Sequence, residues 1–202
     1  MSPEIPDDCD LLFLYAPTSD ITDDEKTIIE KYLSDGGKVY LILGDTTSDT
    51  PNLDEIMSDY GLKKVSGYIA DTQRCYQGNY YAIFPQLSLS GDLGSGISNQ
   101  MVLLLNSPGM EKTDTDNDNL TVTPFMQTSD SGYAVTEKDQ TQGQYILGAV
   151  STNAISSDSS DSDSEDEDDE SDATDTDTKT AKLTVLASAS MISLDITDQL
   201  TT

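Results

Sequence analysis

The chain has no histidine, no tryptophan and few basic residues. Only 10 lysines and arginines stand against 38 aspartates and glutamates, which gives a formal net charge of −28 over 202 residues. Proteins that bind nucleic acid replace its counterions with Lys and Arg side chains, and docking on anionic lipid needs the same residues. The charge therefore excludes nucleic acid and anionic membrane surfaces as partners. A strongly acidic surface also has a general use, because it keeps a protein soluble.

The chain lacks the residues of a metal centre or of a nucleophilic active site. Cys9 and Cys75 are its only cysteines, and without histidine two thiolates are too few for a zinc site. Neither Ser-x-x-Lys nor Gly-x-Ser-x-Gly occurs, so no nucleophile is paired with a base in a known motif. We expect no enzyme activity, no metal and no cofactor. A Cys9–Cys75 disulfide is an open alternative to two free thiols.

Long apolar segments are absent as well. No apolar run reaches the roughly 18 residues that a membrane helix needs, and no basic segment followed by an apolar one marks a signal peptide. Met1 is followed directly by Ser-Pro-Glu-Ile-Pro. We therefore expect these residues to be part of a longer protein whose membrane segments lie elsewhere.

The clearest structural pattern lies near the start of the chain. Residues 11–15 form a short apolar run that is typical of a buried parallel strand. Thr22 and Glu25 form a capping box before a predicted helix over 23–34, and a second apolar run covers 39–43. The apolar side of this helix carries Ile28, Ile29, Tyr32 and Leu33. The order predicts two adjacent parallel strands joined by a helix.

Extended segments dominate the rest of the chain. We expect strands over 101–106, 145–150 and 182–187, and one strand or two short ones over 62–70. The pattern predicts a single α/β domain over 1–202. We expect three layers around a mostly parallel, Rossmann-like or flavodoxin-like sheet, with an added antiparallel portion toward the C-terminus.

Residues 156–178 form a tract of low complexity. It holds twelve acidic residues, no basic residue, and one alanine as its only apolar side chain. Such a composition cannot offset the entropy of ordering, so we expect a disordered acidic insertion between two paired strands. Weak cation binding or a repulsive brush is the functional alternative to a tolerated surface insertion.

A ligand site, if present, is expected at the carboxyl ends of the parallel strands, where open α/β sheets bind ligands. The candidate ligand-binding residues there are Tyr15, Thr18, Asp45 and Ser188. Asp20 and Asp45 could pair as two carboxylates, but Asp20 is equally suited to a turn before the helix. No catalytic residue is predicted.

Several residues of the first segment also carry a family resemblance. The pattern Ile-Pro-x-Asp-x-Asp, a later Pro, the capping box, and Tyr-Leu-x-x-Gly-Gly resembles the gliding-motility-type ABC-transporter auxiliary family (GldG-like), an uncharacterised ABC-type transport system. The residues concerned are Ile5, Pro6, Asp8, Asp10, Pro17, Thr22, Glu25, Tyr32, Leu33, Gly36 and Gly37. Looser matches follow in the same order along most of the chain.

The resemblance implies a bacterial, non-catalytic accessory or interaction domain on the extracytoplasmic face of the cell membrane. Its partners are then the membrane and ATPase subunits of an ABC transport system, or other extracytoplasmic proteins. Membrane contact runs only through segments outside these residues. The alternative function is a small-molecule or carbohydrate-binding domain that uses the strand-end cleft and the tyrosines near Tyr76, Tyr80 and Tyr81.

Overall fold

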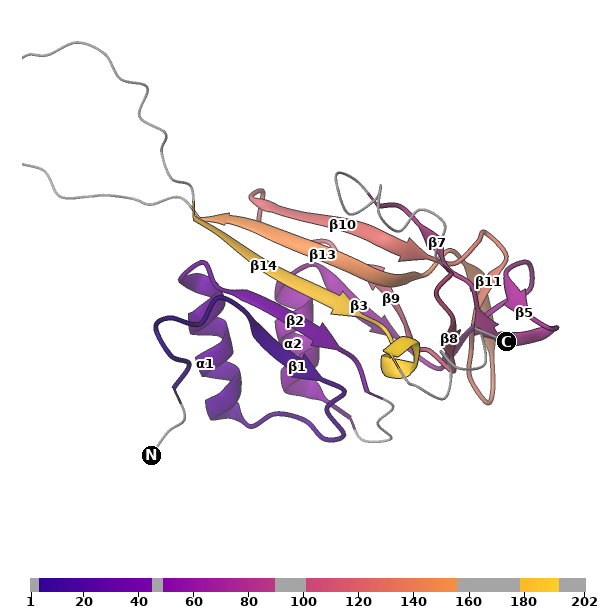
Figure 1. The fold of residues 1–202 in the computed structure, drawn as a ribbon, viewed down its shortest axis with the longest axis horizontal. Coiled ribbons are helices and arrows are strands. Elements are labelled where there is room, and N and C mark those ends of the chain that lie inside the picture. Colours follow the sequence, from indigo (N-terminus) through magenta and orange to yellow (C-terminus); the bar gives the residue numbers. More distant parts are fainter. Residues whose placement is uncertain (1–3, 45–48, 90–100, 156–178, 193–202) are drawn as a thin grey trace, which may run out of the picture.

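The structure of the protein is a computed structural model, which describes residues 4–44, 49–89, 101–155 and 179–192. Among these residues, 44% lie in strands and 17% in helices. Figure 1 shows one long sheet, with the two α-helices against its N-terminal part and smaller sheets at the opposite end. The fold is therefore built mainly from strands.

The N-terminal unit is a parallel strand–helix–strand motif. β1 (Leu12–Tyr15) pairs in parallel with β2 (Lys38–Ile42), and α1 (Asp23–Ser34) connects them. Thr22 Oγ1 accepts a hydrogen bond from the Glu25 N–H at 3.2 Å, and the Glu25 carboxylate accepts one from the Thr22 N–H at 2.8 Å. The predicted motif and its capping box are confirmed.

The apolar side of α1 packs against the sheet as predicted, but not to equal depth. Ile29 and Leu33 are buried, whereas Ile28 and Tyr32 are half-buried. The Tyr32 hydroxyl donates a hydrogen bond to the Cys9 carbonyl at 2.8 Å. A tyrosine at this depth keeps its polar end satisfied, which fixes the segment before β1 against the helix.

The long sheet is completed by strands from the second half of the chain. β14 (Lys179–Leu186) lies beside β2 in parallel and pairs antiparallel with β13 (Ile146–Ile155). β10 (Leu120–Gln127) and β7 (Gln86–Leu87) continue the sheet beyond β13. Along the main path the parallel strands are β1, β2 and β14, and the others run antiparallel to their neighbours.

The hairpin of β13 and β14 confirms the predicted pairing of 145–150 with 182–187. Its register continues to the pair Ile155 and Lys179. The acidic tract 156–178 joins these two strands and lies outside the described residues. Its disorder stays a prediction.

Short elements make up the remainder. α2 (Pro51–Asp59) is followed by two separate strands, β3 (Leu62–Val65) and β4 (Tyr68–Asp71). The other elements are β5 (Cys75–Tyr76), β6 (Asn79–Ile83), β8 (Leu104–Leu105), β9 (Gly109–Lys112), β11 (Gly132–Val135), β12 (Gln140–Gly143) and the 3₁₀ turn η1 (Ala189–Ile192). No helix in the described part of the chain is long and apolar enough to span a membrane.

The expected three-layer, mostly parallel Rossmann-like or flavodoxin-like fold is wrong. The described residues are mostly β, in mixed and antiparallel sheets, with only two α-helices. β12, β11 and β4 form one antiparallel sheet, and β5, β6 and β8 form another. An apolar run predicts that a strand is buried, but it does not specify the direction of its neighbour. Both α-helices of the described residues lie on one face of the long sheet.

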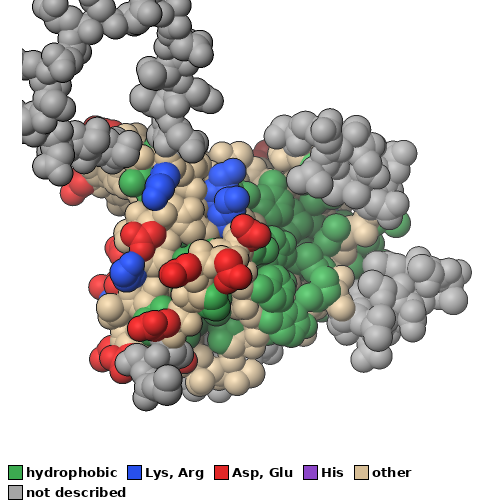
Figure 2. Space-filling model, turned by 60° about the vertical axis from the view of Figure 1, so that its left-hand side comes forward, with side chains coloured by type: hydrophobic (Ala, Val, Ile, Leu, Met, Phe, Trp, Pro, Cys, Tyr) green, Lys and Arg blue, Asp and Glu red, His purple; other side chains and the backbone are tan. Residues whose placement is uncertain are grey.

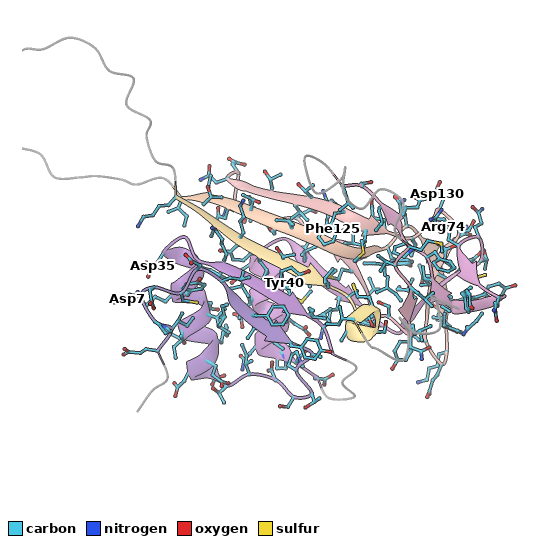
Figure 3. The ribbon with its side chains drawn as sticks, viewed as in Figure 1. Asp7, Asp35, Tyr40, Arg74, Phe125 and Asp130 are labelled. Carbon is cyan, nitrogen blue, oxygen red and sulfur yellow. The ribbon has the colours of Figure 1, made fainter. Side chains whose placement is uncertain are left out.

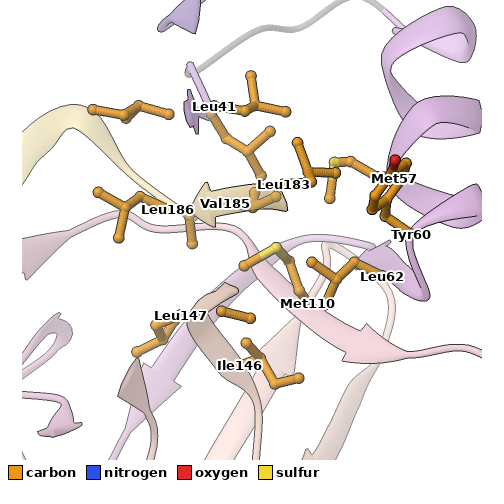
Figure 4. Close-up of a cluster of buried hydrophobic side chains, with 14 of the residues drawn as sticks. Leu41, Met57, Tyr60, Leu62, Met110, Ile146, Leu147, Leu183, Val185 and Leu186 are labelled. Carbon is orange, nitrogen blue, oxygen red and sulfur yellow. The ribbon is translucent and has the colours of Figure 1, made fainter. Parts of the chain in front are cut away.

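The core lies between the long sheet and the α-helices. Figure 4 shows Leu41 of β2, Leu183 of β14 and Met57 of α2 meeting beside Met110 of β9. Each of these side chains is at most 1% exposed. Burying a side chain of this size stabilises the fold by about 1.5–3 kcal/mol, so this cluster holds together elements distant in sequence.

Candidate functional site

The structure places the predicted site residues near one edge of the sheet, but in different surroundings. Tyr15 is the last residue of β1, and its side chain is 54% exposed. Thr18 is exposed in the loop that leads to α1. Ser188 follows β14 and is buried. Asp45 lies outside the described residues.

Ser188 is engaged in local structure. Its hydroxyl donates to Ser190 Oγ at 2.9 Å, and the Ser190 N–H donates back to Ser188 Oγ at 3.1 Å. Ser190 Oγ also accepts a hydrogen bond from the Leu105 N–H at 2.9 Å. The two serines therefore shape the turn into η1 and attach it to β8.

A cleft of about 310 Å³ opens beside the ends of the parallel strands. Its walls come from the loop after β1, the end of β2, the start of α2 and the end of β3. Residues from these elements include Pro17, Gly44, Thr50, Lys64 and Tyr68. Tyr15, Thr18 and Ser188 do not line it. The cleft lies at the strand ends, where a ligand site was expected, but the predicted residues that the structure describes do not line it, and ligand binding there stays a prediction.

Two charged groups of this cleft, Lys64 and Asp54, are paired with each other. Lys64 Nζ donates to Thr50 Oγ1 at 2.6 Å and forms an ion pair with Asp54 Oδ1 at 2.7 Å. Thr50 Oγ1 in turn donates to Asp54 Oδ1 at 3.3 Å. The lysine is thereby held against the first turn of α2. A ligand carboxylate or phosphate would have to compete with Asp54 for it.

The N-terminus of α2 is also occupied from within the chain. The Asp20 carboxylate accepts hydrogen bonds from the Asn52 N–H at 2.9 Å and from the Leu53 N–H at 3.2 Å. Helix N-termini attract anions because their first N–H groups lack partners in the helix. Asp20 fills this position and ties the loop after β1 to α2. The sequence offered a turn or a carboxylate pair for Asp20, and neither describes this role.

The tyrosines of the middle segment lie in a different part of the molecule. Tyr76 packs edge-on against Phe84, with ring centroids 5.9 Å apart. The Arg74 guanidinium donates to the carbonyls of Phe84 and Pro85 at 2.7 and 3.3 Å. Figure 3 places Arg74 at the end of the molecule away from α1. These tyrosines belong to the sheet of β5, β6 and β8 and do not line the strand-end cleft.

Asp71 is the buried acidic residue that sequence reasoning missed. Its side chain is fully buried at the end of β4. One carboxylate oxygen accepts from the N–H groups of Gln73 and Arg74, each at 2.9 Å, and from Ser129 Oγ at 2.8 Å. The other accepts from the Ser129 N–H at 2.7 Å. Burial disfavours the charged form, yet these hydrogen bonds hold the pKa of Asp71 below its ordinary value.

The Asp71 contacts are structural rather than catalytic in character. They join the turn after β4 to the segment between β10 and β11. All four donors come from the protein itself, so both carboxylate oxygens are satisfied in place. Asp71 therefore orients two loops. Both cysteines are half-buried and free.

The two faces of the long sheet differ sharply in exposure. Leu14, Leu41 and Val185 lie side by side on β1, β2 and β14, and pack toward the α-helices. One residue earlier on each strand, Phe13, Tyr40 and Thr184 form the matching row on the opposite face. Because successive side chains alternate across a sheet, this second row lies on the face away from the two described α-helices.

Large hydrophobic side chains gather on this opposite face. Leu11, Phe13 and Tyr15 are 51%, 52% and 54% exposed. The Phe13 ring stacks on Tyr15 at 6.2 Å and on Tyr40 at 5.5 Å between centroids. We call these four residues the aromatic surface. Figure 3 shows Tyr40 in front of the sheet, and Figure 2 shows hydrophobic side chains gathered over one part of the molecule. Contiguous exposed apolar patches mark interaction sites.

One solved structure shares the fold over most of the chain. It is described as the mmIFT52 N-terminal domain, with a TM-score of 0.56 and 14% identity over 94% of this chain and 70% of that chain. At this identity the likeness concerns the fold alone. No curated protein matches the sequence.

The family comparison covers the full length. A model described as ABC-type uncharacterized transport system matches residues 1–202, in agreement with the resemblance carried by the first segment. The family name denotes an auxiliary component of such a system. The chain therefore belongs to the ABC-type uncharacterized transport system family of auxiliary proteins.

Proposed function

We propose that this chain is a non-catalytic contact domain of a membrane-bound ABC transport system, exposed on the extracytoplasmic face of the cell membrane. The observation that carries the proposal is the aromatic surface. Phe13 and Tyr15 are more than half exposed on the sheet face opposite the two described α-helices. Membership of the family indicates that the partner is a transport system. The aromatic surface offers a means of contact with the membrane and ATPase subunits of that system or with neighbouring proteins.

The strand-end cleft supports the non-catalytic part of the proposal. A nucleophile needs an adjacent base, and an acid–base site needs titratable groups that are free to exchange protons. Lys64 is engaged by Asp54 and Thr50, and Asp20 caps α2. These groups stabilise the positions of α2 and its neighbours. This structural role explains their presence, and no catalysed reaction is needed to explain it.

The location rests on the family resemblance and on charge. A formal net charge of −28 opposes approach to the anionic cytoplasmic leaflet. Membrane attachment is assigned to segments outside these residues.

Location is tested in the parent protein with a single labelling site. In a variant with Cys9→Ser and Cys75→Ser, Ser58→Cys on the exposed side of α2 supplies the thiol. We expect a membrane-impermeant maleimide to label intact cells as fully as permeabilised cells. Labelling only after permeabilisation would place the domain in the cytoplasm.

Contact and catalysis are tested with the permease and ATPase subunits in lipid nanodiscs. We expect the purified domain to bind loaded nanodiscs but not empty ones. We also expect it to turn over no nucleotide by itself. Equal binding to empty nanodiscs, or nucleotide turnover by the domain alone, would contradict the proposal.

A further inference from the structure

We infer that a groove beside Arg74 is a binding site for a small carboxylic acid with an apolar body, of the chemical class of the fatty acids. The groove lies at the end of the molecule away from α1, where Figure 3 labels Arg74. The site is separate from the aromatic surface and goes beyond the proposed contact function. The apolar lining of the groove, the fixed position of Arg74 and the distribution of charge around it point to this ligand.

The groove has a volume of about 450 Å³ and is lined mainly by apolar side chains. The segments that meet there are 73–75, 84–87 and 101–102. The apolar residues of the lining are Phe84, Pro85, Leu87, Met101 and Val102. Clefts of roughly 300–1,000 Å³ hold small organic ligands, so the groove has room for a hydrocarbon chain.

Arg74 is held at the wall of the groove by several contacts. Its N–H donates to the buried Asp71 carboxylate at 2.9 Å, and its carbonyl accepts a hydrogen bond from the Phe84 N–H at 2.9 Å. The guanidinium donates through Nε to the Phe84 carbonyl and through Nη2 to the Pro85 carbonyl. A guanidinium has five N–H donors, so these bonds leave others for a ligand. Its planar fork matches the geometry of a carboxylate.

Acidic residues are absent from the segments that form the groove. None occurs from 72 to 89 or from 101 to 110, although the chain has 38 of them. Arg74 is the only arginine of the chain. All ion pairs within the described residues use lysines, so neither Asp130, at the same end of the molecule in Figure 3, nor another described carboxylate pairs with Arg74. A ligand carboxylate would supply this missing partner.

The lining favours a hydrocarbon body over a peptide. A peptide carries N–H and C=O groups that need partners when they leave water. Gln73 is the amide side chain of the lining, and its Nε2 already donates to Ser131 Oγ at 2.7 Å. A fatty acid has one polar end and no other group to satisfy, which suits one guanidinium beside apolar side chains. Its single charge also limits its repulsion from a protein of formal net charge −28.

The probe is parinaric acid, a fatty acid whose fluorescence rises in an apolar site. We expect saturable binding to the purified chain and displacement by dodecanoic acid. The methyl ester of parinaric acid keeps the hydrocarbon chain but loses the charge, so it should bind at least about tenfold more weakly. The peptide Gly-Ser-Gly-Leu-Phe, with a free C-terminus, should displace the probe at least about tenfold less well than dodecanoic acid.

Variants of Arg74 test the role of the guanidinium. Arg74→Gln should weaken binding of the probe by at least about tenfold, because it removes the charge that meets the carboxylate. Arg74→Lys keeps the charge without the fork, and its affinity should lie between those of Arg74→Gln and the parent. Lys138→Gln is the matched control, since Lys138 is exposed in the turn between β11 and β12. It should change the affinity by less than about twofold.

Met101→Asp tests the groove without removing any contact of Arg74. Met101 lines the groove and is 71% exposed, so the fold should tolerate the change. The new carboxylate should repel the ligand and weaken binding by at least about tenfold. Tyr80→Asp adds the same charge at a residue that is 51% exposed and does not line the groove. This control should change the affinity by less than about twofold.

Cys75 reports directly on occupation of the groove. It is half-buried, free and part of the lining, and in the variant Cys9→Ser it is the only thiol of the chain. Saturating dodecanoic acid should slow its reaction with a maleimide by at least about threefold, because a bound ligand covers the walls of its pocket.

The site is wrong if parinaric acid does not bind, if its methyl ester binds equally well, or if folded Arg74→Gln or Met101→Asp binds the probe as tightly as the parent. An unchanged reaction rate of Cys75 under saturating acid would place the ligand elsewhere and contradict the assignment. If the peptide displaces the probe as well as dodecanoic acid does, the groove takes a protein C-terminus and the ligand class is wrong.

Discussion

At the scale of single residues, Asp71 combines full burial with complete hydrogen bonding. Asp71→Asn removes the charge and turns one acceptor oxygen into a donor that faces N–H groups. Leaving a buried partner unsatisfied costs about 1–3 kcal/mol, and we expect a loss of unfolding free energy in that range from urea denaturation. The control is Asp130→Asn on the exposed neighbouring segment. It should change stability by less than about 0.5 kcal/mol.

The contribution of Asp71 to the stability of the fold should also depend on pH. The pKa of Asp71 is lower in the folded protein than its ordinary value, so the unfolded chain takes up the proton first as the pH falls. The stability that Asp71 contributes is complete above the unfolded value of about 3.9 and disappears as the pH falls through the folded pKa. The gap in melting temperature between the parent and Asp71→Asn should narrow below this pH. A gap that stays constant would contradict the assignment.

At the scale of elements, α1 holds the N-terminal unit together through its buried side. Ile29→Ala removes a side chain that is 5% exposed, and we expect a loss of about 2–5 kcal/mol. Thr27→Ala on the exposed side of α1 is the control. A loss below about 0.5 kcal/mol for Ile29→Ala would mean that the helix face is misassigned.

The elements that the sequence could predict are those with strong local signals. α1 has a capping box and an amphipathic pattern, and its strands have short apolar runs with turns on both sides. The strand expected over 101–106 also rests on a clear apolar run, yet only Leu104–Leu105 is a strand. The strand ends before Asn106, whose φ of 46° lies in the left-handed region. A turn of this kind at a residue other than glycine leaves no clear sequence signal.

Other features of the fold depend on contacts between residues that are distant in sequence. Gly67, with φ of 86°, separates β3 from β4, and a Cβ there would collide with the Val135 carbonyl. Asp20 and Asp71 find their partners 32 or more residues away in Asn52 and Ser129. No local pattern contains such pairs. The lining of the strand-end cleft and its internal ion pair therefore could not be predicted from the sequence, and ligand binding at the strand ends stays a prediction.

At the scale of the whole molecule, the acidic tract is predicted to be a tolerated insertion. Ile155 and Lys179 are paired at the end of the β13–β14 hairpin, so a short Gly-containing turn could replace 156–178. We expect the deletion variant to fold and to gain on the order of 1 kcal/mol, because loop closure costs less and self-repulsion falls. Thermal melting with and without calcium is the measurement. If calcium raises the melting temperature of the parent alone by many degrees, the tract is a structural ion site.

At the scale of the whole molecule, the aromatic surface is the proposed place where this domain meets its partner. Residue-resolved hydrogen exchange of the domain, alone and with nanodiscs that carry the permease and ATPase subunits, tests this most directly. The amides of Phe13 and Tyr15, whose side chains belong to the aromatic surface, should become protected on binding. Those of Leu12 and Leu14 should change little, because they already bond to β2. Unchanged exchange at Phe13 and Tyr15, with protection at the start of α2 instead, would contradict the account.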